Sequence, residues 1–369
     1  MKDEPALLVR LADRSYPIHL GEGLLDRAGQ LIAPVLREPR AFLVVDANLL
    51  DTPHPERLAA SLATADIAVE TLAVPPGEGS KSFAGLERLI DGLLERGIER
   101  RSTVLALGGG VVGDLAGFAA AIVLRGVDYV QLPTTLLAQV DSAVGGKTGI
   151  DTPRGKNLVG AFKQPRAVVA DTSALDSLPV RELRAGYAEI VKYGCIRDAA
   201  FFAWLEEHGG KLLAGDPEAR ATAVRRSLEI KAAIVARDER EESGERALLN
   251  FGHTFAHAYE ALAGYGSRLL HGEAVAIGMV AAARLSARLG LAPETDARRL
   301  ERHLEASGLP ISPRALGLSF APEALLARMR HDKKVAAGRP RFVLWRGIGD
   351  AVLTEAVPRD MLYELLAAG

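Results

Sequence analysis

The chain contains very little cysteine, because Cys195 is the only one among its 369 residues. A single thiol excludes an internal disulfide and is typical of proteins that work in a reducing cytoplasm. The opening residues, MKDEPALLVR, carry acidic side chains and no apolar core, so no secretory signal is expected there. The sequence therefore predicts a cytoplasmic protein.

Long hydrophobic runs and a charge excess are also missing. The longest apolar stretches, near 117–124 and 275–283, contain glycine and fall short of the roughly 20 residues that span a bilayer. The 45 basic and 47 acidic residues nearly cancel, giving a formal net charge of −2. The overall charge thus favours neither nucleic acid nor an anionic membrane as a partner.

The length and the pattern of apolar segments indicate two domains. A chain of 369 residues exceeds what one hydrophobic core usually holds. Up to about residue 176, short apolar strands alternate with helices, which predicts a parallel sheet covered on both faces. Helical periodicity dominates from residue 177, with one late hairpin near 341–356. We predict an α/β domain over 1–176, a helical domain over 177–369, and an active site in the cleft between them.

A glycine-rich segment follows the predicted strand 102–107 and opens a helix. Gly108, Gly110 and Gly113 satisfy G-x-G-x-x-G, a spacing that lets backbone amides approach a pyrophosphate. For the pattern alone, a turn without a ligand is equally compatible. The plausible ribose acid, Asp46, ends an earlier strand instead of following the glycines. These features predict a Rossmann-like dinucleotide domain of unusual topology, with further contacts from Glu78 and Lys81.

A polar segment in the middle of the chain gathers groups that suit an anion. Lys147 follows two glycines, but a phosphate loop of nucleotide triphosphatases requires glycine at 141, where Asp141 stands. Lys147, Lys156 and Asn157 on this glycine-bearing loop suit a phosphate or carboxylate. Each lysine taken singly is compatible with an ordinary surface position.

The richest segment runs from Arg246 to His271 and contains three of the eight histidines. Arg246, Asn250, His253 and His257 are spaced by four, three and four residues, so one helix would carry all four on one face. His271 would open the next helix, whose dipole would keep it neutral. The set indicates a metal site beside an anionic substrate.

Glu189 is the acid that would complete this metal site, and Lys192 lies one helical turn after it. One acid, two histidines and an open position are the composition of a catalytic divalent-metal site, commonly zinc. The spacing His253-x-x-x-His257 is shared with zinc proteases, but Thr254 stands where their general-base glutamate is needed. A peptidase is therefore excluded. Any one of these histidines alone would more often be a core or capping residue.

Seven stretches of the sequence together resemble 3-dehydroquinate synthases, of the sugar-phosphate cyclase superfamily. They follow one another in the family's order over most of the chain. The stretches are GGGVVGDLAGFAAA (108–121), LRGVDYVQLPTTLLAQVDSAVGGKTGID (124–151), GKNLVGAFKQP (155–165), LRAGYAEIVKYG (183–194), RALLNFGHTFAHAYEALAGYG (246–266), LLHGEAVAIGM (269–279) and DKKV (332–335).

The resemblance implies roles for particular residues. It implies Zn²⁺ or Co²⁺ held by Glu189, His253 and His271, and a homodimer in which Arg125 reaches the partner's substrate phosphate. It implies catalytic roles for Lys147, Lys192, Arg246, Asn250 and His257. The implied NAD ligands are Asp46, Asn48, Glu78, Lys81, Gly109, Gly110, Val111, Asp114, Thr134, Thr135, Asp141, Lys147, Lys156 and Ser177. The implied substrate ligands are Arg125, Asp141, Lys147, Lys156, Asn157, Lys192, Lys231, Arg246, Asn250, His257, Lys333 and Lys334.

The implied reaction converts 3-deoxy-D-arabino-heptulosonate 7-phosphate, a keto acid phosphate, to 3-dehydroquinate in the shikimate pathway. It proceeds by transient oxidation with NAD⁺, elimination of phosphate, reduction, ring opening and an intramolecular aldol closure. A sibling cyclase acting on sedoheptulose 7-phosphate is one alternative, although Lys231 and Arg246 match the family's carboxylate ligands and that sugar has no carboxylate. A metal-dependent polyol dehydrogenase of the glycerol type is a second. A non-catalytic nucleotide-binding relative is a third, but no metal ligand is missing.

Overall fold

The computed structural model describes residues 5–330 and 341–368, which fall into two compact units. The first comprises Met1–Pro179 with Arg220–Ala236, and the second comprises Val180–Ala219 with Arg237–Gly369. The segment Arg220–Ala236, which the sequence placed in the helical domain, groups with the first unit. Each unit has its own architecture.

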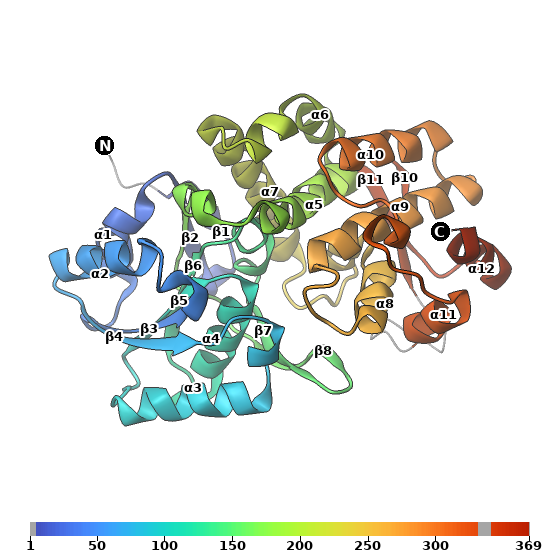
Figure 1. Ribbon diagram of the computed structural model, residues 1–369. Helices are drawn as coiled ribbons and strands as arrows, with labels where there is room; N and C mark the ends of the chain where they lie inside the picture. The colour runs from blue at the N-terminus through green and yellow to red at the C-terminus, as the bar shows by residue number, and fades with distance from the viewer. Residues whose placement is uncertain (1–4, 331–340, 369) are drawn as a thin grey trace. The chain divides into compact units, whose positions relative to one another are not determined.

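A seven-stranded sheet in the order β1-β2-β9-β6-β5-β3-β4 forms the centre of the first unit (Figure 1). Only β1 is antiparallel, pairing with β2, and the other neighbours are parallel. This confirms the predicted parallel sheet. The strands are β1 (Leu7–Val9), β2 (Tyr16–Gly21), β3 (Arg40–Asp46), β4 (Ala68–Val74), β5 (Thr103–Gly108), β6 (Asp128–Pro133) and β9 (Val168–Asp171).

The strands are apolar on both faces because helices cover both faces. Along β3, Leu43 and Val45 belong to one buried cluster, and Phe42 and Val44 belong to another. Figure 1 shows the first face covered by α1 and α2 and the second by α3 and α4. Successive side chains of a strand point to opposite faces, so a strand covered twice reads as an unbroken apolar run. The helices are α1 (Ala28–Ile32), α2 (His54–Thr64), α3 (Phe83–Glu95), α4 (Gly110–Ile122) and most of α7 (Pro217–Arg237).

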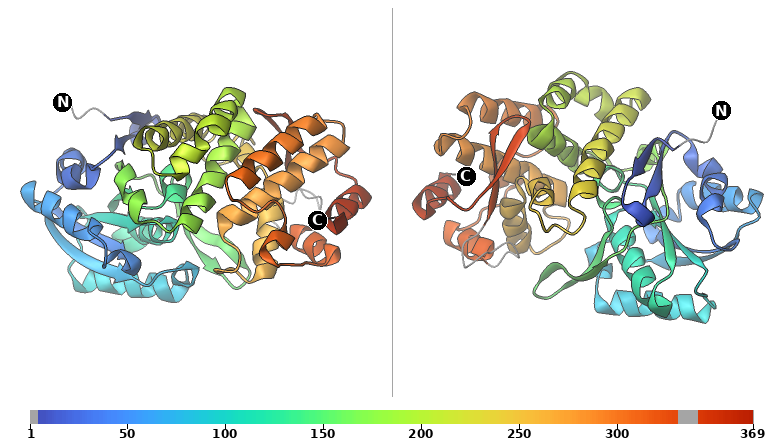
Figure 2. Two further views of the ribbon diagram at one scale, coloured as in Figure 1. Left: turned by 45° about the horizontal axis from the view of Figure 1, so that its top comes forward. Right: turned by 180° about the vertical axis from the view of Figure 1, so that it is seen from behind.

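The polar segment that the sequence assigned to a flexible loop is instead an antiparallel hairpin, β7 (Lys147–Thr152) with β8 (Gly155–Phe162). Figure 2 shows it projecting from the unit. A Cβ on Gly117 of α4 would lie 2.5 Å from Thr148 Cγ2, so glycine allows helix and hairpin to pack closely. Glycine, lysine and asparagine have weak strand propensity, which is why the pattern did not indicate strands.

Helices dominate the second unit, as expected, and the late hairpin of β10 and β11 is confirmed. The central helix α9 packs against α5, α8 and α10. Within the described residues, no helix combines the length and apolarity needed to cross a bilayer. The elements are α5 (Val180–Arg197), α6 (Ala199–Leu213), α8 (His253–Ala263), α9 (His271–Arg288), α10 (Glu294–Ala306), α11 (Pro322–Arg330), β10 (Phe342–Gly347), β11 (Asp350–Thr354) and α12 (Arg359–Ala368).

One prediction about the histidine-rich segment is wrong. No single helix carries Arg246, Asn250, His253 and His257 on one face. Arg246–Asn250 form a 3-10 helix, and the chain breaks at Gly252 before α8 begins. Gly252 has φ of +79°, and a Cβ there would lie 2.6 Å from the Met279 amide nitrogen. The close approach of α9 therefore imposes a turn that the spacing of the polar residues did not reveal.

Candidate active site

The glycine loop lies where the sequence predicted it, between the end of β5 and the start of α4. A Cβ on Gly109 would lie 3.1 Å from Thr135 Cγ2, and one on Gly110 would lie 3.0 Å from Ser142 Oγ. The Thr134 amide donates to the Gly108 carbonyl over 3.0 Å. The structure thus brings Gly109, Gly110, Val111, Thr134 and Thr135 together at the carboxyl edge of the sheet, where α/β proteins bind nucleotides.

Asp46 ends β3, the strand beside β5, at the same edge of the sheet. Its carboxylate accepts a 2.9 Å hydrogen bond from the Asn48 amide and caps the following turn. A carboxylate at this position in the sheet suits the ribose hydroxyls of a dinucleotide. The topology thus supplies the acid from a neighbouring strand, as the sequence suggested.

Lys81 joins residues predicted for the nucleotide and for the substrate. Its Nζ lies 2.8 Å from Asp114 Oδ2 and 2.7 Å from Asn157 Oδ1, and only 3% of the residue is exposed. Glu78 lies 3.7 Å from Lys81 and 3.3 Å from Lys156. Burial alone would lower the pKa of Lys81, but Asp114 and Glu78 outweigh burial and raise it. Lys81 therefore stays charged and holds this cluster together.

Three further predicted residues of the first unit are held by partners. Lys231 is buried on α7 and lies 2.6 Å from Asp141 Oδ1, so these two predicted ligands are adjacent. Ser177 Oγ lies 2.8 Å from Nε2 of the buried His54, which sequence reasoning missed. The residues around His54 in the sequence indicated only the start of a helix and not its contact with Ser177.

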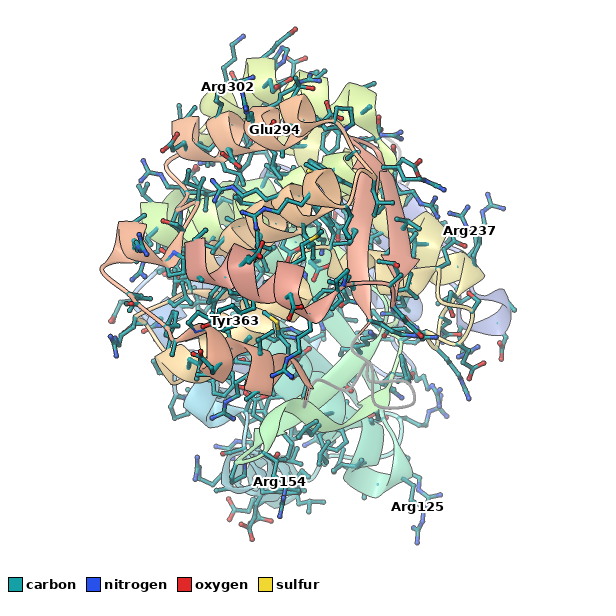
Figure 3. The ribbon with its side chains drawn as sticks, turned by 90° about the vertical axis from the view of Figure 1, so that its right-hand side faces the viewer. Arg125, Arg154, Arg237, Glu294, Arg302 and Tyr363 are labelled. Carbon is teal, nitrogen blue, oxygen red and sulfur yellow. The ribbon has the colours of Figure 1, made fainter. Side chains whose placement is uncertain are left out.

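Arg125 is exposed at the end of α4 and points outward (Figure 3). Its backbone has φ of +66°, and its neighbour Leu124 has φ of +51°. Two successive non-glycine residues in the left-handed region are uncommon. The predicted ligands Lys333 and Lys334 lie outside the described residues.

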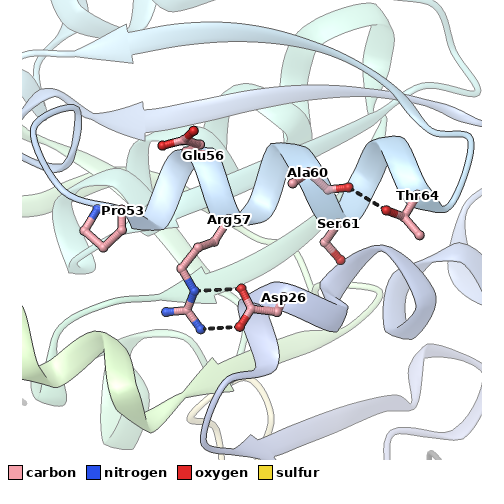
Figure 4. Close-up of a pocket in the computed structure, with 7 residues that line it drawn as sticks. All are labelled: Asp26, Pro53, Glu56, Arg57, Ala60, Ser61 and Thr64. Carbon is pink, nitrogen blue, oxygen red and sulfur yellow. Dashed lines mark hydrogen bonds and ion pairs between the residues drawn. The ribbon is translucent and has the colours of Figure 1, made fainter.

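A shallow pocket beside α2 does not coincide with any predicted site (Figure 4). Its guanidinium, Arg57, is bound by Asp26 through contacts of 2.7 and 2.9 Å. Because Arg57 is already paired with Asp26, it does not provide an open cationic site for an anionic ligand. We assign it no role.

The candidate metal centre lies in the second unit and contains the three residues predicted as ligands. Glu189 comes from α5, His253 is the first residue of α8, and His271 is the first residue of α9. One ligand atom of each lies within 4.8 Å of the other two. Glu189 Oε1 is 3.4 Å from His253 Nε2 and 3.5 Å from His271 Nε2. Two ligands at tetrahedral angles about zinc are separated by about 3.3 Å, so the spacing fits a cation.

The surroundings of the triad also fit a metal. Glu189 is fully buried, and neither of its oxygens accepts a well-formed hydrogen bond from a described residue, although Lys192 lies within ion-pair distance. His253 Nδ1 lies 3.2 Å from the Phe251 carbonyl, and His271 Nδ1 lies 3.2 Å from Glu260 Oε2. These contacts place the proton on Nδ1 and leave both Nε2 atoms as donors of electron pairs to a cation.

Two carboxylates affect the charge of His271. Burial would lower the pKa of His271, but Glu260 and Glu189 outweigh burial and raise it to about 10. These carboxylates favour a charged His271 ring and therefore oppose the helix dipole, which the sequence predicted would keep the ring neutral. His253 behaves oppositely, and burial lowers its pKa to about 4.

The other predicted residues of the second unit lie near the triad in sequence or space. Lys192 is 1% exposed and pairs with Glu189, and the His257 ring is 5.6 Å from the His253 ring. Arg246 and Asn250 lie on the 3-10 helix before α8. Asn250 Nδ2 donates to Glu241 Oε1 over 3.1 Å.

Asp238 shapes the loop that delivers Arg246, and sequence reasoning missed it. Its carboxylate accepts hydrogen bonds from the backbone amides of Glu242, Ser243 and Arg246, at 2.8, 3.2 and 3.0 Å. Burial alone would raise the pKa of Asp238, but these amides lower it to about 2. An acid four to eight residues before polar positions is too common in sequences to have indicated this role.

The low pKa of Asp238 predicts an acid-sensitive loop. Because folding favours the ionised form, the stabilisation is present above the ordinary pKa near 3.8 and is lost as the pH falls toward 2. We expect the wild-type chain to lose about 2 kcal/mol more free energy of unfolding between pH 5 and 2 than Asp238→Asn. Urea unfolding over this pH range measures the difference. Parallel pH profiles for the two proteins would contradict the assignment.

Comparison with known sequences identifies relatives over the whole chain. The sequence model of the 3-dehydroquinate synthase N-terminal domain matches residues 71–185, and that of the C-terminal domain matches residues 186–335. A 3-dehydroquinate synthase of Rhodospirillum rubrum is 60% identical over 365 residues, covering 98% of this chain and 94% of the relative. One from Caulobacter vibrioides is 54% identical over 360 residues, covering 97% of each.

Solved structures with the same fold include other cyclases. A 2-epi-5-epi-valiolone synthase from Streptomyces hygroscopicus subsp. jinggangensis, with NAD⁺ and Zn²⁺ bound, is 31% identical with a TM-score of 0.88, covering 97% of this chain and 98% of that one. A 2-deoxy-scyllo-inosose synthase complexed with carbaglucose-6-phosphate, NAD⁺ and Co²⁺ is 26% identical with a TM-score of 0.89, covering 98% and 99%. A glycerol dehydrogenase from Schizosaccharomyces pombe, 17% identical with a TM-score of 0.68, shares the fold. With matches to both domains and 60% identity to a full-length relative, this chain belongs to the 3-dehydroquinate synthase family.

Proposed function

We propose that this protein converts 3-deoxy-D-arabino-heptulosonate 7-phosphate to 3-dehydroquinate and phosphate, in the shikimate pathway to chorismate and aromatic amino acids. The observation that carries the proposal is the close grouping of Glu189, His253 and His271, in a chain 60% identical to a named synthase. When bound, NAD⁺ supplies a regenerated hydride acceptor and Zn²⁺ or Co²⁺ supplies a Lewis acid.

For the cofactors, the first unit offers a nucleotide site and the second a metal site. Gly109, Gly110 and Val111 present backbone amides at the start of α4 to a pyrophosphate, and Thr134 and Thr135 line the same loop. The further ligands that we propose for NAD are Asp46, Asn48, Glu78, Lys81, Asp114, Asp141, Lys147, Lys156 and Ser177. The triad would hold the metal through Glu189 and the two Nε2 atoms.

The substrate carries a carboxylate and a phosphate, and the chain has cations for both. Lys231 and Arg246 are 5% and 3% exposed, and we assign them to the carboxylate. Two buried cations suit a substrate that carries a carboxylate, and sedoheptulose 7-phosphate has none, so we favour the keto acid phosphate as the substrate. The remaining ligands that we propose for the hydroxyls and the phosphate are Lys147, Lys156, Asn157, Lys192, Asn250, His257 and one or both of Lys333 and Lys334.

We further propose that the enzyme is a cytoplasmic homodimer. Arg125 is exposed and points outward, which suits a cation that serves a partner's substrate phosphate. Cys195 is buried and is the chain's single thiol, which suits a reducing compartment. Sedimentation of the purified protein tests the assembly.

The reaction itself is tested by measuring phosphate release in the presence of NAD⁺ and Zn²⁺ while absorbance follows NADH. We expect release from the keto acid phosphate with no net NADH, and loss of release when a chelator removes the metal. Release only from sedoheptulose 7-phosphate would assign the chain to the sibling cyclases. Steady NADH formation from glycerol would make it a polyol dehydrogenase and leave its lysine cluster unexplained.

A further inference from the structure

The two histidines of the metal triad are held in different ways. His253 has a side chain only 9% exposed, and its Nδ1 faces a neutral backbone carbonyl, that of Phe251. The His271 side chain is 29% exposed, so packing restrains its ring less. A ligand that is loosely packed needs a directed hydrogen bond to keep its Nε2 aimed at the cation.

Glu260 provides that bond to His271. Its Oε2 lies 3.2 Å from His271 Nδ1, and its side chain is 2% exposed. Glu260 follows His253 by seven residues on α8, so the two side chains share a face of the helix two turns apart. Helix α8 thus supplies both His253, a predicted metal ligand, and the Glu260 carboxylate, which faces the predicted ligand His271.

A separate set of contacts fixes the backbone at His271. Glu273 accepts from the Leu270 amide over 2.9 Å and binds the Arg181 guanidinium at 2.6 and 2.8 Å. Arg181 also donates to the Ser267 carbonyl over 2.7 Å. Glu273 therefore anchors the start of α9, whereas Glu260 contacts the imidazole ring. The two acids can be separated by experiment.

We propose that Glu260 is a positioning residue that orients His271 and raises its strength as a metal ligand. The proposal rests on the metal site of the proposed function. The carboxylate accepts the Nδ1 proton, fixes the tautomer that presents Nε2, and increases the electron density on the ring. Losing such a partner typically weakens metal binding by about 10- to 100-fold.

The test measures Zn²⁺ affinity by competition with a chromophoric chelator, without any substrate. Glu260→Gln keeps an acceptor but removes the charge, and we expect about 10-fold weaker binding. Glu260→Leu removes both, and we expect about 100-fold weaker binding. Glu273→Gln is the matched control, a buried acid on the same pair of helices, and we expect its Zn²⁺ affinity to stay within about threefold of wild type. The visible spectrum of the Co²⁺-loaded protein, which reports ligand geometry, should change only in the Glu260 variants.

Each outcome decides the question. The graded loss at Glu260, with an unchanged control, supports the positioning role even if the chain fails to turn over the keto acid phosphate. Wild-type Zn²⁺ affinity in Glu260→Gln and Glu260→Leu would overturn it. An equal loss in Glu273→Gln would also overturn it, because general packing of α8 and α9 would then account for the effect.

Discussion

Replacing His271 by alanine is expected to lower kcat/KM for 3-deoxy-D-arabino-heptulosonate 7-phosphate by about 10³- to 10⁵-fold. Its Nε2 lies 3.5 Å from Glu189 Oε1, and the described residues bring three candidate protein ligands together there. Loss of one ligand removes Lewis-acid stabilisation of several kcal/mol, and about 1.4 kcal/mol corresponds to tenfold in rate. Phosphate release and bound zinc, measured on the same sample, check the prediction.

His271 is a cleaner target than Glu189. Removing the Glu189 charge would leave Lys192, which is 1% exposed, without its ion-pair partner. Breaking a buried pair in this way costs about 3–5 kcal/mol of stability and would confuse folding with catalysis. His208→Ala is the matched control, because that ring stacks on Trp204 of α6 at 4.6 Å and contacts none of the triad. Full turnover by metal-free His271→Ala would refute the metal assignment.

Lys81→Met is expected to lower the free energy of unfolding by about 3–5 kcal/mol. Its ammonium is buried between Asp114 and Asn157, at 2.8 and 2.7 Å, so the substitution leaves the Asp114 carboxylate without its cation. Asn157, held with φ of +52°, also loses the donor that fixes its side chain. We therefore expect weaker binding of NAD⁺ and of substrate in the same variant. Urea unfolding and NAD⁺ titration measure the two effects.

A double-mutant cycle separates the charge from the packing. Lys81→Met/Asp114→Asn removes both charges, so it should recover a substantial part of the lost stability, with a coupling energy of about 1–3 kcal/mol. Lys211→Met on α6 is the control, because that lysine is exposed and should change stability by less than about 0.5 kcal/mol. Additive effects of the two substitutions would show that the ion pair does not stabilise the cluster.

Local patterns in the sequence were sufficient to predict the parallel sheet and the three residues of the candidate metal site. The apolar run of β3 and the glycines at the start of α4 are patterns of a few neighbouring residues. Such patterns can be recognised in the amino-acid sequence. Glu189, His253 and His271 were found from residue type and from the family resemblance. Their spatial grouping within 4.8 Å was then confirmed.

Long-range packing decided what the sequence missed. The turn at Gly252 exists because α9 approaches there, and the β7–β8 hairpin exists because its strands pair with each other and lie on α4. Glu260, His54 and Asp238 have neighbours in sequence that resemble those of any helix or loop. Their roles arise from contacts with His271, Ser177 and the 242–246 backbone.

By itself, the sequence determined most of the strands and helices, the glycine loop before α4, the residue types of the candidate metal site and the family resemblance. These depend on periodicity and residue type, which act over one or two turns of chain. Only the tertiary structure decided which carboxylate orients which histidine and which lysine is buried among acids. Such choices depend on how helices and strands distant in sequence pack, because a side chain can pair only with what packing brings within about 3 Å.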